Sequence, residues 1–237
     1  MTFVLILADT FLSVMKRIPA LCIVFFAFSW SLRAQLISSA SLKAGISSSS
    51  PKHTGDFYFV GEDALVAFSL EGCIGFFRST YFESILSVGY GTKGYYYEID
   101  PFVYGESSAP SDELKKYYAK YDVLSVAIEE KFKYPLQKWE PYLSVGPRVD
   151  IVTKLKGELI TAFAEEYYSK TNFGLNTKIG VNYSLNAKLA LDVSIGYQPD
   201  FTEFYKAPVT FFREGDEVRM RNSTFNALVG VAYSFSK

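Results

Sequence analysis

The chain has 237 residues, a formal charge of -1 and a composition that is 49% hydrophobic and 17% aromatic. This length suits one domain, and the near-neutral charge gives no support to a nucleic-acid-binding surface. The two cysteines, Cys22 and Cys73, and one histidine, His53, are too few for a disulfide framework or a cysteine-rich metal site. We therefore expect no cofactor, no metal and no nucleic acid.

Residues 1–34 are predicted to be an upstream extension followed by a secretory signal peptide. Lys16 and Arg17 form a short positive start before an apolar run that is short for a membrane helix. A small residue ends the segment, as a cleavage site requires. We place the true start at Met15 and cleavage after Ala34. An uncleaved N-terminal anchor is the alternative.

Eight segments beyond the signal peptide alternate apolar and polar residues with period two, which indicates β-strands whose two faces meet different environments. In one of them Leu143 and Val149 lie on one side, and Arg148 and Asp150 lie on the other. Most segments reach the roughly 9–11 residues that a tilted strand needs to cross a bilayer. The predicted strands are residues 38–48, 63–77, 81–97, 121–134, 140–153, 172–185, 187–198 and 224–236.

Short and long connections alternate between these strands. The long ones cover residues 49–62, 98–120, 154–171 and 199–223. Outer-membrane barrels with short periplasmic turns and long extracellular loops have this arrangement. We therefore predict that residues 35–237 form an all-β, eight-stranded antiparallel transmembrane up-and-down β-barrel in the outer membrane, with both termini in the periplasm.

Aromatic residues gather near both ends of the predicted strands, as in the two belts of a spanning barrel. Tyr95 and Phe204 belong to the group near the long connections, and Trp139 and Tyr142 to the group near the short turns. A soluble, lipocalin-like barrel with its apolar side buried is the alternative. The polar side is rich in Gly and Ser and the apolar side holds almost no charge, which favours the membrane form. A short helix is also expected at residues 112–120.

The polar faces of the predicted strands contain charges of both signs. A barrel of eight strands has room for little besides side chains, and a buried charge needs a partner. We therefore expect a structural network of ion pairs that plugs the lumen, with Cys73 as an inert filler. A narrow path for protons or ions is the alternative. The network is predicted to comprise Lys43, Glu71, Glu83, Glu129, Lys131, Arg148, Asp150, Lys178 and Asp192.

Three segments resemble the PorT-like outer-membrane β-barrel family of Gram-negative bacteria. They are Pro141–Pro147, a proline-tyrosine-leucine strand that ends in glycine-proline, the tyrosine-led strand Tyr121–Val126, and the closing strand Gly230–Phe235. The resemblance covers about residues 36–237. It implies an eight-stranded outer-membrane barrel and an accessory role in protein secretion, since the family's namesake is a secretion accessory. It assigns no functional residues.

These observations predict a non-enzymatic outer-membrane barrel with a structural, binding or secretion-accessory role. Its expected partners are outer-membrane lipid, lipopolysaccharide, the barrel-assembly machinery and secretion-system proteins. The long connections mix acids and bases, so we expect them to contact lipopolysaccharide directly or through divalent cations. A narrow pore is one alternative. A lipid-modifying enzyme that uses His53 as general base, beside Ser47–Ser50 and Asp56, is another.

Overall fold

The structure is a computed structural model that describes residues 37–54, 61–99, 115–157, 167–208 and 217–235. The predicted signal peptide, residues 1–34, lies outside the described residues. No helix in the described ranges is long and apolar enough to cross a membrane.

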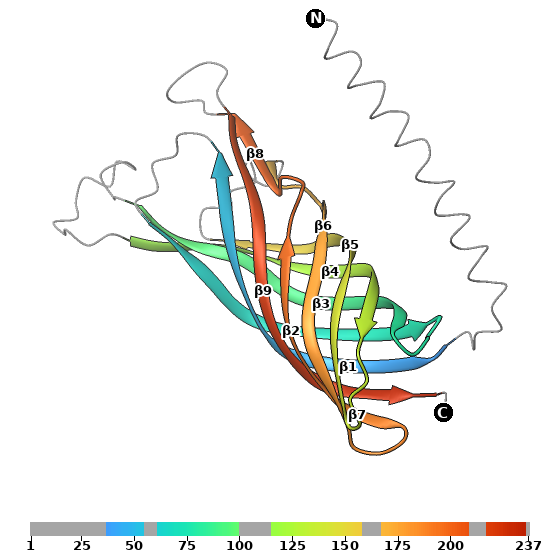
Figure 1. The fold of residues 1–237 in the computed structure, drawn as a ribbon. Coiled ribbons are helices and arrows are strands. Elements are labelled where there is room, and N and C mark those ends of the chain that lie inside the picture. Colours follow the sequence, from blue (N-terminus) through green and yellow to red (C-terminus); the bar gives the residue numbers. More distant parts are fainter. Residues whose placement is uncertain (1–36, 55–60, 100–114, 158–166, 209–216, 236–237) are drawn as a thin grey trace, which may run out of the picture. The chain divides into compact units, whose positions relative to one another are not determined.

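Antiparallel strands form one closed wall (Figure 1). Neighbours follow the order β1-β2-β3-β4-β5-β6-β7-β9, and β9 pairs with β1 to close the barrel. The predicted eight-stranded antiparallel barrel is therefore confirmed. The strands are β1 (Ser39–Thr54), β2 (Gly61–Phe76), β3 (Phe82–Ile99), β4 (Lys115–Lys133), β5 (Trp139–Gly157), β6 (Thr171–Ser184), β7 (Leu189–Pro199), β8 (Tyr205–Pro208) and β9 (Glu217–Ser234).

Several strands extend further toward the long connections than the sequence predicts. β4 begins at Lys115, and residues 115–120 pair with residues 94–99 of β3. The predicted helix at 112–120 is therefore wrong over 115–120, while residues 112–114 lie outside the description. The regular apolar alternation ends with the lipid-facing part of each strand, whereas the backbone ladder continues beyond it.

The connection after β7 contains an additional short strand, β8, which the sequence did not predict. Beyond the end of β7, the amide of Asp200 donates to the carbonyl of Asn222 at 2.8 Å. The amide of Phe201 donates to the carbonyl of Phe173 at 2.8 Å. β8 then pairs with β9. This segment therefore continues the wall between β6 and β9 where β7 stops.

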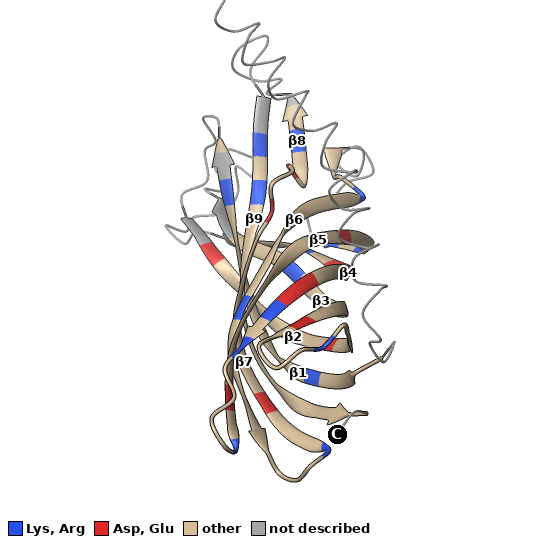
Figure 2. Cartoon of the chain, turned by 45° about the vertical axis from the view of Figure 1, so that its right-hand side comes forward, with Lys and Arg blue, Asp and Glu red and all other residues tan. Residues whose placement is uncertain are grey.

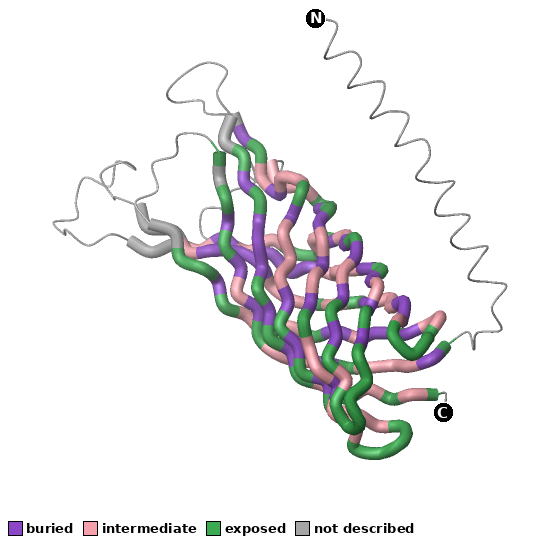
Figure 3. The backbone as a smooth tube through the Cα atoms, viewed as in Figure 1, coloured by how far each residue is buried: buried purple, intermediate pink, exposed green. Residues whose placement is uncertain are grey.

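Burial alternates along the strands, as Figure 3 shows. Large apolar side chains point outward and are well exposed, among them Leu42 (61%), Phe68 (64%), Ile179 (68%) and Ile195 (66%). Most inward positions are filled by buried polar residues. An apolar outer band around a polar interior is the arrangement of a barrel in lipid, and it is the reverse of a soluble barrel.

The predicted aromatic belts are correct for some residues and wrong for others. Tyr81 and Tyr134 stack on the outer surface near the short turns, and Trp139, at the start of β5, is 53% exposed. Tyr95, Phe204 and Tyr142, in contrast, are buried at 3%, 1% and 5% exposure. Aromatic character alone did not reveal which face of the wall these rings occupy.

Candidate functional site

The nine charged residues predicted to face the lumen are all buried inside the barrel wall, with 6% exposure or less. They come from β1 to β7, and Figure 2 shows charged positions along these strands. The structure brings eight of them into ion pairs in three groups along the barrel. The ninth, Lys131, has no carboxylate within ion-pair distance among the described residues.

The largest group, here the central network, joins β1, β2, β4, β6 and β7. Lys178 Nζ lies 2.6 Å from Glu71 Oε2 and 2.9 Å from Glu129 Oε1. Lys43 Nζ lies 3.1 Å from Asp192 Oδ2 and 3.9 Å from Glu71 Oε1. Two ammonium groups thus alternate with three carboxylates across the interior.

Glu129 has the most complete set of partners in this network and is 0% exposed. Besides Lys178, its carboxylate accepts hydrogen bonds from Ser87 at 2.7 Å, Ser144 at 2.5 Å and Asn176 at 2.9 Å. A buried carboxylate is stable only when such donors replace its lost hydration. The small polar residues on neighbouring strands are therefore part of the network.

A second group, the upper network, lies on the side of the long connections. Lys93 Nζ contacts Asp150 at 2.6 Å and Asp200 at 3.4 Å. The Arg148 guanidinium contacts Asp150 at 3.1 Å and also pairs with Asp200. A cluster of buried residues, here called the aromatic cluster, packs further toward the long connections and comprises Tyr95, Ala119, Tyr121, Val123, Phe204 and Met220.

The third group lies toward the short turns. Glu83 pairs with Lys133 at 3.3 Å and accepts hydrogen bonds from the hydroxyls of Ser38 at 2.8 Å and Ser39 at 2.7 Å. Lys131 lies opposite Glu83 in the ladder but points to the ring of Tyr142, with its Nζ 3.8 Å from the ring centroid. The lower group therefore leaves one ammonium outside the ion pairs.

Four members of these groups were missed in the predicted network: Lys93, Lys133, Tyr142 and Asp200. Tyr142 donates to Asp192 at 2.8 Å and accepts from Lys43 at 3.2 Å. The alternation of side chains along the strand could have predicted the inward position of Tyr142, since Tyr142 lies on the same side of β5 as the inward Ser144. Gly180 makes room for the ring, because a Cβ there would lie 2.5 Å from the Tyr142 Cζ atom.

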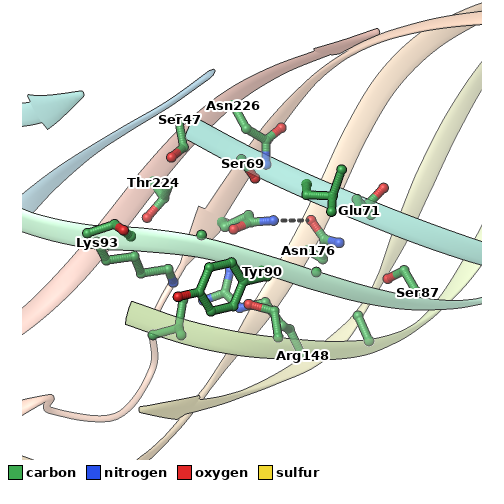
Figure 4. Close-up of a pocket in the computed structure, with 18 residues that line it drawn as sticks. Ser47, Ser69, Glu71, Ser87, Tyr90, Lys93, Arg148, Asn176, Thr224 and Asn226 are labelled. Atoms are coloured by element: carbon green, nitrogen blue, oxygen red, sulfur yellow. Dashed lines mark hydrogen bonds between the residues drawn. The ribbon is translucent and has the colours of Figure 1, made fainter. Parts of the chain in front are cut away.

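Two cavities lie on opposite sides of the central network. Figure 4 shows the smaller one, of about 30 Å³, between Glu71 and Asn176 on one side and Lys93 and Arg148 on the other. This is room for one or two water molecules. The larger cavity, of about 560 Å³, opens at the short turns and ends at Lys43 and Asp192. The lumen is thus interrupted by side chains between the two cavities.

Only some of the residues that the lipid-modifying enzyme would use belong to the described part of the chain. The backbone of His53 belongs to β1, opposite Met220, and is not in a loop as expected. Its side chain and Asp56 lie outside the described residues. Ser49 is fully buried and exchanges hydrogen bonds with the backbone of Gly94 at 2.7 and 2.8 Å. Ser49 therefore has a structural role, because its hydroxyl bridges β1 to the backbone of β3.

Cys73 is buried, and its thiol donates to Glu71 at 3.3 Å. No group of three or more His, Cys, Asp or Glu side chains in the described ranges is arranged to hold a metal ion.

The model of the outer membrane protein beta-barrel domain family matches residues 19–235. The chain belongs to this family. It is therefore an outer-membrane barrel, as the exposed apolar band also indicates. The match is to the general family, so the finer PorT-like resemblance stays a prediction.

Solved structures of outer-membrane barrels are similar to this chain. Neisserial surface protein A has 15% identity and a TM-score of 0.44, over 83% of this chain and 97% of that one. The N-terminal barrel domain of Pseudomonas aeruginosa OprF has 13% identity and a TM-score of 0.40, over 86% and 100%. The attachment invasion locus protein Ail of Yersinia pestis has 14% identity and a TM-score of 0.37, over 84% and 99%. No curated protein matches the chain significantly. These likenesses are too distant to inform function.

Proposed function

We propose that this outer-membrane barrel is a sealed, non-enzymatic membrane anchor whose outer surface, on the side of the long connections, binds the phosphate groups of lipopolysaccharide. In this proposal the short turns and both termini face the periplasm, because short periplasmic turns and long external loops are the rule for such barrels. The ion pairs of the central and upper networks support the sealed lumen.

The observation that supports lipopolysaccharide binding is a group of exposed cations, here called the basic patch: Lys52, Lys206, Arg219 and Arg221. Lys52 pairs with Arg221 in the β1–β9 ladder, and Lys206 pairs with Arg219 in the β8–β9 ladder. Strand pairing therefore fixes them as neighbours. Glu203 lies 3.6 Å from the Arg219 guanidinium and 3.5 Å from the Arg221 guanidinium.

The patch lies just beyond the apolar band. Among the described side chains of β9, the last strongly exposed apolar residue is Phe225, at 58% exposure, and Arg221 follows four positions further toward the long connections. At about 3.3 Å per residue this is a rise of about 13 Å along the strand. Such a height corresponds to the headgroup region, where Arg and Lys bind phosphate by charge-assisted hydrogen bonds.

Binding of lipopolysaccharide to the purified barrel in detergent tests this proposal. A variant with Gln at all four patch positions should bind at least tenfold more weakly than the wild type. Lys138→Gln, an exposed cation in a short turn, is the matched control and should bind normally. Dephosphorylated lipid A should bind both proteins equally weakly. Unchanged affinity of the fourfold variant would refute the role of the patch.

A secretion-accessory role is a second proposal, and it is supported by the PorT-like sequence of Pro141–Pro147 in β5. A sealed lumen makes the barrel a docking platform for other secretion proteins and not a conduit. Deleting the chain should then reduce the amount of secreted protein in the culture medium, and the fourfold patch variant should restore it. Normal secretion in the deletion strain would exclude this role.

A further inference from the structure

The larger cavity contains an ammonium group, that of Lys131, which has no carboxylate within ion-pair distance among the described residues. The described part of the barrel has five inward-pointing lysines. Lys43, Lys93, Lys133 and Lys178 each lie within 3.3 Å of a carboxylate oxygen. Lys131 is buried to the same degree, at 6% exposure, and lines the cavity at the short turns.

The only contact that the structure gives the Lys131 Nζ, among the described residues, is with the ring of Tyr142, at 3.8 Å from its centroid. A ring face attracts a cation, but it cannot accept three separate N–H donors in the way that oxygen atoms do. A buried ammonium without oxygen partners is unfavourable. Lys131 therefore has donor capacity directed into the cavity.

Neighbouring carboxylates are already engaged elsewhere. Glu83 is bonded by Lys133, Ser38 and Ser39. Asp192 is bonded by Lys43 and Tyr142.

The third cavity carboxylate, Glu140, accepts from Asn182 at 2.9 Å and lies 3.8 Å from Arg78. None of the three lies within ion-pair distance of Lys131. An acidic partner for Lys131 would therefore have to enter the cavity from outside the described chain.

The shape of the cavity fits such an entry. Its volume of about 560 Å³ is in the range of small-molecule sites, and its mouth is formed by the β2–β3 and β6–β7 turns. Arg78 and Lys188 stand at this mouth and Lys43 at the inner end. An anion would thus meet cations at the entrance, beside Lys131 and at the closed end.

We propose that this cavity is a binding site for a small oxyanion, a phosphate or carboxylate group, with Lys131 as its principal ligand. The cavity ends at the central network, so the bound anion stays on the side of the short turns. The site is distinct from the basic patch, which lies on the outer surface at the other end of the barrel. It does not depend on lipopolysaccharide binding or on the orientation of the barrel.

Calorimetric titration of the purified, refolded full-length barrel in a neutral detergent tests the site. The probes are inorganic phosphate and succinate, titrated separately at constant ionic strength. We expect saturable binding of at least one of them, and the pair distinguishes a phosphate from a carboxylate site. Lys131→Met keeps an unbranched side chain that is one atom shorter and removes the charge, and it should weaken binding at least tenfold.

Two variants complete the experiment. Lys131→Arg keeps the charge and should retain binding, and Lys138→Met removes an exposed cation outside the cavity and should bind as the wild type does. Absence of saturable binding in the wild type, or equal binding by Lys131→Met, would overturn the proposal.

If Lys131→Met does not refold, a crystal of the wild type soaked in selenate decides the question. Anomalous signal within hydrogen-bond distance of Lys131 Nζ supports the site. Its absence there, or Lys131 paired with Glu83, overturns it.

Discussion

Replacing Glu129 by Ala should be among the most destabilising single changes in the barrel interior. The carboxylate is 0% exposed and accepts hydrogen bonds from Ser87, Ser144, Asn176 and Lys178. Removing one partner of a buried ion pair costs about 3–5 kcal/mol. Lys178 still pairs with Glu71 at 2.6 Å in the variant, which reduces this cost. Each neutral donor that loses its acceptor, on Ser87, Ser144 or Asn176, adds about 1 kcal/mol to it. The net expectation is a loss of about 3–5 kcal/mol.

Reversible urea unfolding in phospholipid vesicles, followed by the fluorescence of Trp139, measures this loss. Glu140→Gln is the matched control, because its partner Arg78 lies 3.8 Å away and is 31% exposed. Exposed pairs of this kind contribute no more than about 1 kcal/mol. If Glu129→Ala costs as little as the control, water screens the interior and the central network is not packed.

Three further changes test other parts of the wall. Phe68→Arg, at an outward position with 64% exposure, should destabilise the barrel in vesicles by about 2–4 kcal/mol. Ser50→Arg, beyond the apolar band, should destabilise it by less than about 1 kcal/mol. Equal losses of stability would contradict the position of the band. Phe204→Ala should lower the free energy of unfolding by about 3–5 kcal/mol, because the ring is 1% exposed and stacks on Tyr121 at 5.3 Å between centroids. A loss below about 1 kcal/mol would show that the aromatic cluster is not packed. Gly180→Ala should lower the free energy of unfolding by about 1–3 kcal/mol, and by less when Tyr142 is also replaced by Ala. Additive effects of the two changes would contradict the close approach of the Tyr142 ring to Gly180.

The sequence predicts the lipid-facing half of the barrel well, because the bilayer imposes a strict alternation there. All nine predicted lumen charges are buried inside the wall, and the same parity rule explains the inward position of Tyr142, which was assigned to a belt. Beyond the bilayer both faces of a strand can be polar. The alternation then weakens, and the upper part of β4 was assigned to a helix and β8 was missed.

The pairing of the lumen charges could not be predicted from the sequence. A strand pattern gives the face on which a side chain lies but not its conformation or the partner it selects across the barrel. Glu83 and Lys131 are opposite each other in the ladder, yet Glu83 bonds to Lys133. Asp200 joins the upper network from beyond the end of β7.

Conductance of the purified barrel in a planar lipid bilayer tests the sealed lumen most directly. The central and upper networks interrupt the lumen between the two cavities, so the wild type should give no current steps above the baseline of the bare bilayer. Glu129→Ala, which opens the central network, is the variant to compare. Reproducible steps from the folded wild type would show an open path through the barrel and would contradict the account.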